Sequence, residues 1–192
     1  RFEHSAVLRG DTMIVFGGLA KPPGGAIAPD TSVWGFYRKG DQPNPGWNWH
    51  QFVTHGNPGP RFSHAACFDA STQRMIVFGG KSSAGGSPAD TTVWALRFHD
   101  PGPWEATWSQ LTIVNPSVHP TPRYDHTMDY DVVLVNDASI TVHSILLNSA
   151  VLFGGCGAGG APNNEIWRLY IIGADSAQWK QITLSGTPPS AR

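Results

Sequence analysis

The sequence has few charged residues and no excess of either sign. Its 192 residues include 13 Lys and Arg against 14 Asp and Glu, a formal net charge of −1. Such a balance gives no electrostatic footprint for nucleic acid or for an anionic membrane. No apolar run approaches the roughly 18 residues that a membrane-spanning helix needs. We therefore expect neither nucleic acid nor a membrane as a partner.

Cysteine is also scarce. Cys67 and Cys156 are the only two cysteines, too few for a disulfide framework and too far apart for a metal knuckle. Free buried thiols are expected, with a disulfide as the alternative. The first residues, Arg1 to His4, have no initiator Met and no signal-peptide pattern. We therefore expect the chain to begin inside a longer protein.

Glycine, proline and tryptophan, in contrast, are abundant. The chain has 22 Gly, 16 Pro and 8 Trp. Glycine and proline at this density favour many short strands joined by turns over helices. The composition therefore predicts an all-β fold.

A pattern of four landmarks occurs three times along the chain. Each unit opens with Arg-x-x-His, continues with an apolar strand ending in Phe-Gly-Gly, and then has two strands marked by tryptophan. The units begin at Arg1, Arg61 and Arg123 and are 60, 62 and 69 residues long. The recurring glycines and tryptophans are Gly17, Gly18, Gly79, Gly80, Gly154, Gly155, Trp34, Trp94, Trp167, Trp49, Trp108 and Trp179. Four ordered landmarks repeated three times indicate a repeat architecture.

The landmarks have a physical meaning. The apolar runs before each Gly-Gly suit strands buried on both faces. The glycine pair is expected where no Cβ fits, through a positive φ or a close neighbour. Each unit then supplies four strands of one antiparallel sheet, and such a sheet buries its two faces only by stacking against further copies.

The Gly-Gly doublet, the two tryptophan strands and the proline before each Arg resemble the Kelch repeat over essentially the whole chain. The resemblance implies one propeller blade per repeat, usually roughly five to seven blades in a ring, and a role in binding partners. The expected fold is a partial β-propeller of three four-stranded antiparallel blades, at 1–60, 61–122 and 123–191. Trp replaces the Tyr that the family often has on the third strand. Further repeats or self-association, with two chains forming a six-bladed ring, would complete the propeller.

Residues that recur in the same register are expected to do the same structural job in each blade. This applies to His4, His64 and His126, for which a metal site at the propeller axis is the alternative. It also applies to the tryptophan pairs, for which packing between blades is favoured over stacking on sugars. No catalytic residue, metal or cofactor is expected.

The partner-binding candidates lie in the connections between strands. In the Kelch family the loops after Gly-Gly and before the next Arg share one face, which is often the binding face. Arg61, Arg123, Lys81 and His119 are the candidates there, although a structural role for the arginines is the stronger alternative. Trp47 and Trp104 fall outside the repeat pattern and are expected to be exposed aromatic contacts. We expect the partner to be another protein.

Two features of the sequence bear on a role as an enzyme. Residues 155–160 match G-x-G-x-x-G, but a dinucleotide site needs a helix next, and Ala161 to Asn164 lead into the Trp167 strand. The second hypothesis places the chain in a larger Kelch-type enzyme similar to galactose oxidase, whose copper needs a Tyr and His ligand set. None of the four tyrosines lies near a His-His pair with suitable spacing. Binding is therefore favoured over catalysis, with a carbohydrate-binding propeller as a further alternative.

The third repeat carries an insertion. From the opening Arg to the Phe of Phe-Gly-Gly the units take 15, 17 and 30 residues. Two β-branched runs surround Asn136-Asp137, which predicts a hairpin extending two strands over about 131–149, opposite the Gly-rich loops. It is either a neutral expansion or an exposed edge for a partner.

Overall fold

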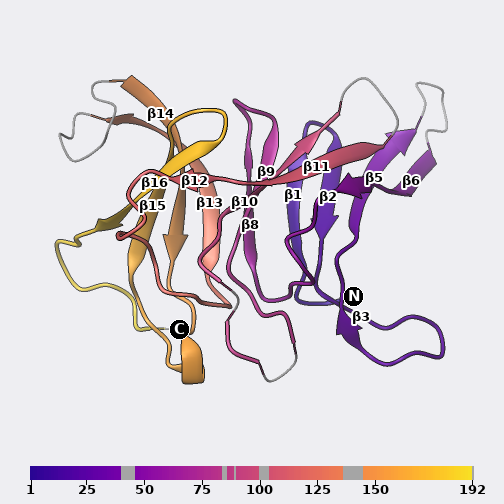
Figure 1. The fold of residues 1–192 in the computed structure, drawn as a ribbon, viewed down its shortest axis with the longest axis horizontal. Helices are drawn as coiled ribbons and strands as arrows, with labels where there is room; N and C mark the ends of the chain where they lie inside the picture. The colour runs from indigo at the N-terminus through magenta and orange to yellow at the C-terminus, as the bar shows by residue number, and fades with distance from the viewer. Residues whose placement is uncertain (40–45, 84–85, 89, 100–103, 136–144, 192) are drawn as a thin grey trace.

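The computed structural model describes residues 1–39, 46–83, 86–88, 90–99, 104–135 and 145–191. Three antiparallel sheets stand side by side in chain order (Figure 1). These ranges contain one short 3-10 turn, η1 (Ala158–Gly160), no α-helix, and no helix able to cross a membrane. The predicted all-β fold is confirmed.

Each repeat supplies four antiparallel strands to its sheet. The first sheet contains β1 (Ser5–Arg9), β2 (Thr12–Phe16), β5 (Val33–Lys39) and β6 (Gly46–Gln51). The second contains β8 (Ala65–Asp69), β9 (Arg74–Phe78), β10 (Trp94–Phe98) and β11 (Glu105–Gln110). The third contains β13 (Thr127–Val135), β14 (Ile145–Phe153), β15 (Ile166–Ile171) and β16 (Ser176–Ile182). A separate two-stranded ribbon, β3 (Leu19–Ala20) with β4 (Ala28–Pro29), follows the first Gly-Gly.

The prediction of four strands per sheet needs one correction. The second and third sheets have five strands, because β7 (Val53–His55) pairs parallel with β11 and β12 (Thr112–Ile113) pairs parallel with β16. After its last strand, each of the first two repeats therefore runs along the outer edge of the next sheet. Pairing of the main chain across this edge links consecutive repeats beyond side-chain packing.

The core lies between the sheets and has two parts. One cluster joins the first and second sheets, and the other joins the second and third. The Phe of Phe-Gly-Gly is central in both: Phe16 contacts Trp108 at 4.7 Å between ring centroids, and Phe78 contacts Trp179 at 5.2 Å. The tryptophan on the last strand of a repeat thus packs back onto the preceding sheet. Trp49 has no preceding sheet in this chain and is 53% exposed.

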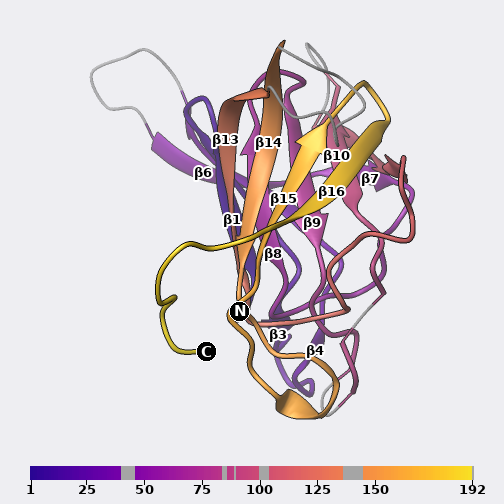
Figure 2. The same cartoon turned by 90° about the vertical axis from the view of Figure 1, so that its left-hand side faces the viewer.

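The third sheet has the longest strands. β13 and β14 have nine residues each and pair from Thr127–Phe153 to Val135–Ile145. The Asn136-Asp137 turn lies outside the described residues. The distal ends of these strands point away from the end that carries β3 and β4 (Figure 2). Tyr130 donates a hydrogen bond of 2.7 Å to the Asn148 side chain, which in turn donates to Ser71 of the second repeat.

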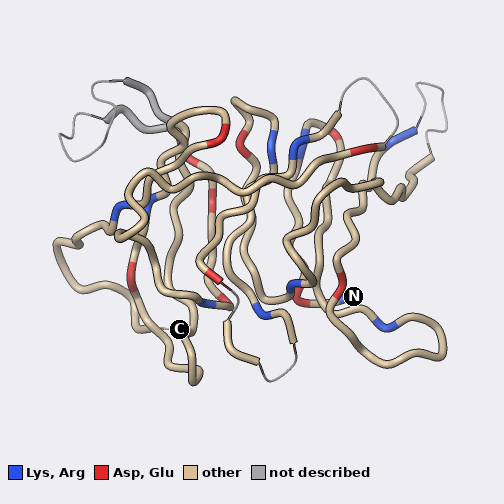
Figure 3. Tube along the Cα trace, viewed as in Figure 1, with Lys and Arg blue, Asp and Glu red and all other residues tan. Residues whose placement is uncertain are grey.

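We call the end that carries the Gly-Gly doublets the loop face. It is formed by residues 17–32, 56–63, 79–83, 86–88, 90–92, 115–125 and 154–165, and lies at the bottom of Figure 1. Lys and Arg are interspersed with Asp and Glu along the described chain (Figure 3). A partner is therefore not selected by a strong net field on this face.

Candidate functional site

The opening arginines of the second and third repeats lie inside the fold. Arg61 is 3% exposed; its guanidinium donates to the Gly79 carbonyl at 3.0 Å and pairs with Asp90 at 3.2 Å. Arg123 is fully buried; its guanidinium donates to the Gly154 carbonyl at 3.0 Å and pairs with Glu165 at 2.5 Å. The candidate contact residues Arg61 and Arg123 are therefore corrected to structural joints, because their cationic groups are used within their own sheets.

The main chain of the same arginines explains the Gly-Gly doublets. The Arg61 carbonyl accepts a hydrogen bond from the Gly18 amide at 2.7 Å, and the Arg123 carbonyl accepts one from Gly80 at 2.8 Å. A Cβ on Gly17 would lie 2.4 Å from the Arg61 carbonyl oxygen. The doublet therefore recurs because the next repeat crosses directly against it.

Two of the three recurring histidines, His64 and His126, are buried at the same junctions. His64 and His126 are each 6% exposed, and His64 Nε2 lies 2.7 Å from Ser5 Oγ of the preceding sheet. Burial, reinforced by the charge of Arg61, lowers the pKa of His64 to about 3. Burial and Arg123 lower the pKa of His126 to about 3 as well. Both rings are therefore neutral near pH 7.

Stability is expected to fall with acid through these two rings. A folded pKa of about 3, below the unfolded value of about 6.5, gives stability that is complete above pH 6.5 and is lost as pH falls toward 3. Each ring contributes a slope of up to about 1.4 kcal/mol per pH unit. Urea unfolding between pH 7 and pH 5 measures this slope. His64→Gln should reduce this slope by the contribution of one ring, up to about 1.4 kcal/mol per pH unit. An unchanged slope would contradict the low pKa of His64.

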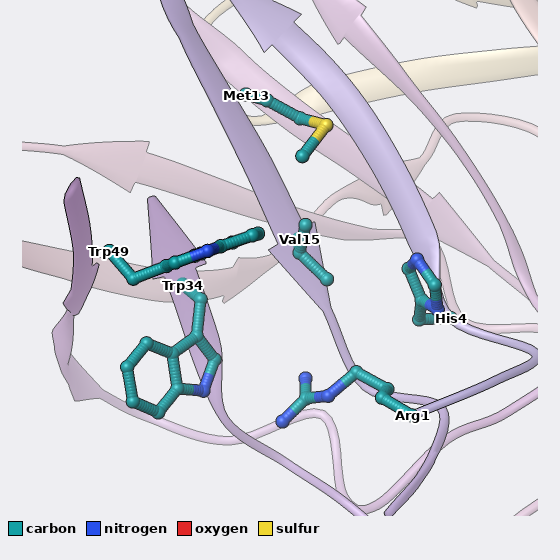
Figure 4. A pocket seen from close by; sticks show the side chains of 6 residues that line it. All are labelled: Arg1, His4, Met13, Val15, Trp34 and Trp49. Atoms are coloured by element: carbon teal, nitrogen blue, oxygen red, sulfur yellow. The ribbon is translucent and has the colours of Figure 1, made fainter. Parts of the chain in front are cut away.

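The first sheet leaves an open cleft on the side away from the second sheet. It has a volume of about 610 Å³ and is lined by Arg1, His4, Met13, Val15, Trp34 and Trp49 (Figure 4). The same register positions of the second sheet are Met75, Val77, Trp94 and Trp108, which pack against the first sheet. The cleft is thus an uncovered packing face. Its largely apolar lining offers few polar groups to orient a sugar.

The other predicted contact residues do not form one site. Lys81 holds its ammonium group 3.6 Å from the centre of the Tyr124 ring, and His119 is half-buried in a hollow of about 200 Å³, both on the loop face. Trp104 is corrected to a packing residue, because its ring contacts Tyr37 at 4.5 Å between the first and second sheets. Trp47 is 60% exposed and lies on β6, away from Lys81 and His119.

Sequence comparison places this geometry in a family. A family model described as the KLHDC2/KLHL20/DRC7 Kelch-repeats domain matches residues 3–192. The chain belongs to the Kelch-repeat family. The Kelch resemblance found in the sequence is thereby confirmed.

The Kelch region is similar to parts of larger proteins. It is 25% identical over 194 residues to the dynein alpha chain of the flagellar outer arm of Chlamydomonas reinhardtii, covering 100% of this chain and 4% of that protein. It is 27% identical over 186 residues to an F-box/kelch-repeat protein of Arabidopsis thaliana, covering 95% and 33%. The solved structure of YjhT superposes with a TM-score of 0.59 at 13% identity, covering 98% of this chain and 54% of that chain, which shows the fold alone.

The structure also shows where the cysteines, the glycine-rich segment and the histidines lie in the Kelch fold. Both cysteines are free; Cys67 is buried between the second and third sheets, and burial raises the pKa of its thiol. The Gly155–Gly160 segment forms bridges from Cys156 to Tyr124 and Pro162 and contains the turn η1, without the helix that a nucleotide phosphate would need. Within the described ranges, no three His, Cys, Asp or Glu side chains form a metal-holding group. His4, His64 and His126 occupy the same position in three different repeats.

Proposed function

We propose that this Kelch chain is part of a protein-binding module that contacts its partner through the loop face. One observation carries the proposal. The recurring side chains make contacts within and between the sheets, whereas the loops of the loop face differ from one repeat to the next. These loops expose apolar side chains, including Ile27 at 55% and Val118 at 37%. Exposed apolar groups on a rigid scaffold are suited to protein contacts.

Neighbouring repeats meet on the loop face, so a partner bound there would contact more than one repeat. Lys81 follows the second Gly-Gly and contacts Tyr124 of the third repeat. The hollow at His119 is bordered by Thr91 and Thr92, which precede β10, and by Pro116. Segments distant in sequence therefore offer one composite surface.

Catalysis is supported less well than binding. The groups with the most strongly shifted pKa values are His64, His126 and Cys67, and all three are enclosed between sheets. A general acid or base must reach the proton that it transfers. The similarity to regions of a dynein chain and of an F-box/kelch-repeat protein is consistent with a module inside a larger protein.

Paired variants at the two ends of the sheets test the proposal. Ile27→Glu and Val118→Glu place a charge on the loop face, and Asp11→Lys reverses a charge at the opposite end, in the turn between β1 and β2. We expect the loop-face variants to capture about tenfold less of the partner recovered with the wild-type full-length protein, measured by quantitative mass spectrometry. Asp11→Lys should capture as much as wild type. Equal capture by all three, with unchanged melting temperatures, would refute binding through the loop face.

A further inference from the structure

On the face that looks toward the following sheet, one row of residues crosses the first three strands of each repeat. In the first sheet the row is Val7, Ile14 and Gly35, and in the second it is Cys67, Ile76 and Ala95. Every member of these two rows is buried. The paired positions of the third sheet are Asp129, Val151 and Arg168. On the fourth strand the row continues with a polar residue in every sheet, namely His50, Ser109 and Lys180. Over the first three strands, an apolar row with Gly or Ala is replaced in the third sheet by a row with a carboxylate and a guanidinium.

The charged groups of the third sheet are held on its open face. The Arg168 side chain is 19% exposed and donates to Asp131 at 2.8 Å and to Ser149 Oγ at 2.9 Å. Asp129 is exposed and borders a hollow of about 440 Å³ with Thr127 and Asp131. Phe153 and Ile166 occupy the adjacent row nearest the loop face, where the second sheet has Phe78 and Val93. The open face thus combines an apolar row with a charged row.

The open face of the first sheet has the opposite character. One row contains Ala6, Val15, Trp34 and Gln51, and the next contains Leu8, Met13, Phe36 and Trp49, so the face is apolar apart from Gln51. The matching rows of the second sheet pack on Val7, Ile14 and Gly35. If this apolar face covered Asp129 and Arg168, a carboxylate and a guanidinium would lose water without gaining hydrogen bonds, which is strongly unfavourable.

We infer that Asp129 and Arg168 prevent the two open faces of this chain from closing on each other. The open face of the first sheet is a docking surface for a further Kelch sheet that carries an apolar residue and Gly or Ala at these two positions. A second copy of this chain does not meet that requirement. The two residues therefore act by unfavourable burial against a wrong neighbour, a general route to specificity. This inference argues against the six-bladed ring of two chains considered from the sequence.

The test is to convert the third sheet to the pattern of the other two. Asp129→Val with Arg168→Ala reproduces the row of the first two sheets, and Arg97→Ala with Glu105→Ala removes the same charges from the second sheet as a control. Sedimentation velocity of the 192-residue chain measures self-association. We expect wild type and control to remain monomeric, and the converted variant to associate at least about tenfold more tightly. Adding Trp49→Asp to the converted variant should return it to monomer.

Every outcome decides the inference. Wild-type dimers that are lost on Trp49→Asp would show that the two open faces do fit each other and would overturn it. A converted variant that folds, as judged by its melting temperature, and yet stays monomeric would overturn the role of Asp129 and Arg168. Association of the converted variant that persists with Trp49→Asp would show that a different surface is used, which also contradicts it.

Discussion

Gly79→Ala should lower the free energy of unfolding by about 3 kcal/mol. Gly79 has a φ of +68°, and a Cβ there would lie 2.4 Å from the Arg123 carbonyl oxygen and 2.6 Å from Cε1 of His126. The substitution adds backbone strain to a steric clash with the main chain of the next repeat, and each contributes about 1–3 kcal/mol. Urea unfolding at pH 7 measures the loss.

Gly10→Ala is the matched control for this prediction. Gly10 has a φ of +54°, but a Cβ there would meet nothing within 4 Å. It should therefore cost only about 1 kcal/mol, the strain alone. Equal losses at Gly10 and Gly79 would show that the close approach of the third repeat does not matter, and the joint would have to be assigned elsewhere.

Arg123→Met should cost about 2–3 kcal/mol, because it leaves the buried Gly154 carbonyl and the half-buried Asn163 and Glu165 side chains without their donor. The guanidinium donates to the Gly154 carbonyl and to the Asn163 and Glu165 side chains, at 3.0, 3.1 and 2.5 Å. Burial alone would raise the pKa of Glu165, but hydrogen bonds from Arg123 and Trp167 outweigh it and hold the pKa below its usual value. The variant should therefore also raise the pKa of Glu165, which NMR titration of its side-chain carboxyl detects.

Arg1→Met changes the same register position in a more exposed setting. Arg1 donates to the Gly17 carbonyl at 3.0 Å and pairs with Asp30 at 2.8 Å, but its side chain is 21% exposed. Water can replace a lost donor there, so a loss of about 1 kcal/mol or less is expected. A loss at Arg123 no larger than that at Arg1 would contradict the burial argument.

Local pattern was sufficient to predict the repeats. Whether a short apolar run ending in Phe-Gly-Gly forms a strand depends mainly on residues close to it in the sequence. The strands β2, β9 and β14 could therefore be predicted directly. The packing of Trp108 and Trp179 also followed, because a residue repeated in register does the same job in each sheet. The added strands β7 and β12 could not be predicted in this way: they are only three and two residues long, and they pair with the outer strand of the next repeat.

The candidate site was harder to predict, because the direction of a side chain depends on what surrounds it. Arg61 and Arg123 lie next to exposed loops in sequence, yet their guanidinium groups are buried and donate to the Gly79 and Gly154 carbonyls. Trp104 breaks the repeat pattern, yet it fills the space above Gly35 between two sheets. Among the described candidates, Trp47 kept the exposure that the sequence predicted.

By itself the sequence determined that the chain is all-β, that it contains three Kelch repeats, and where the glycine joints fall, because these features are local and recur. The tertiary structure decided which cations are buried, how the edges of consecutive sheets are linked, and how the two open faces differ. Asp129 and Arg168 are 39 residues apart in the sequence, and only strand pairing through Val151 brings them into one row. The character of that face therefore depends on the register of three strands, which no single segment of the sequence specifies.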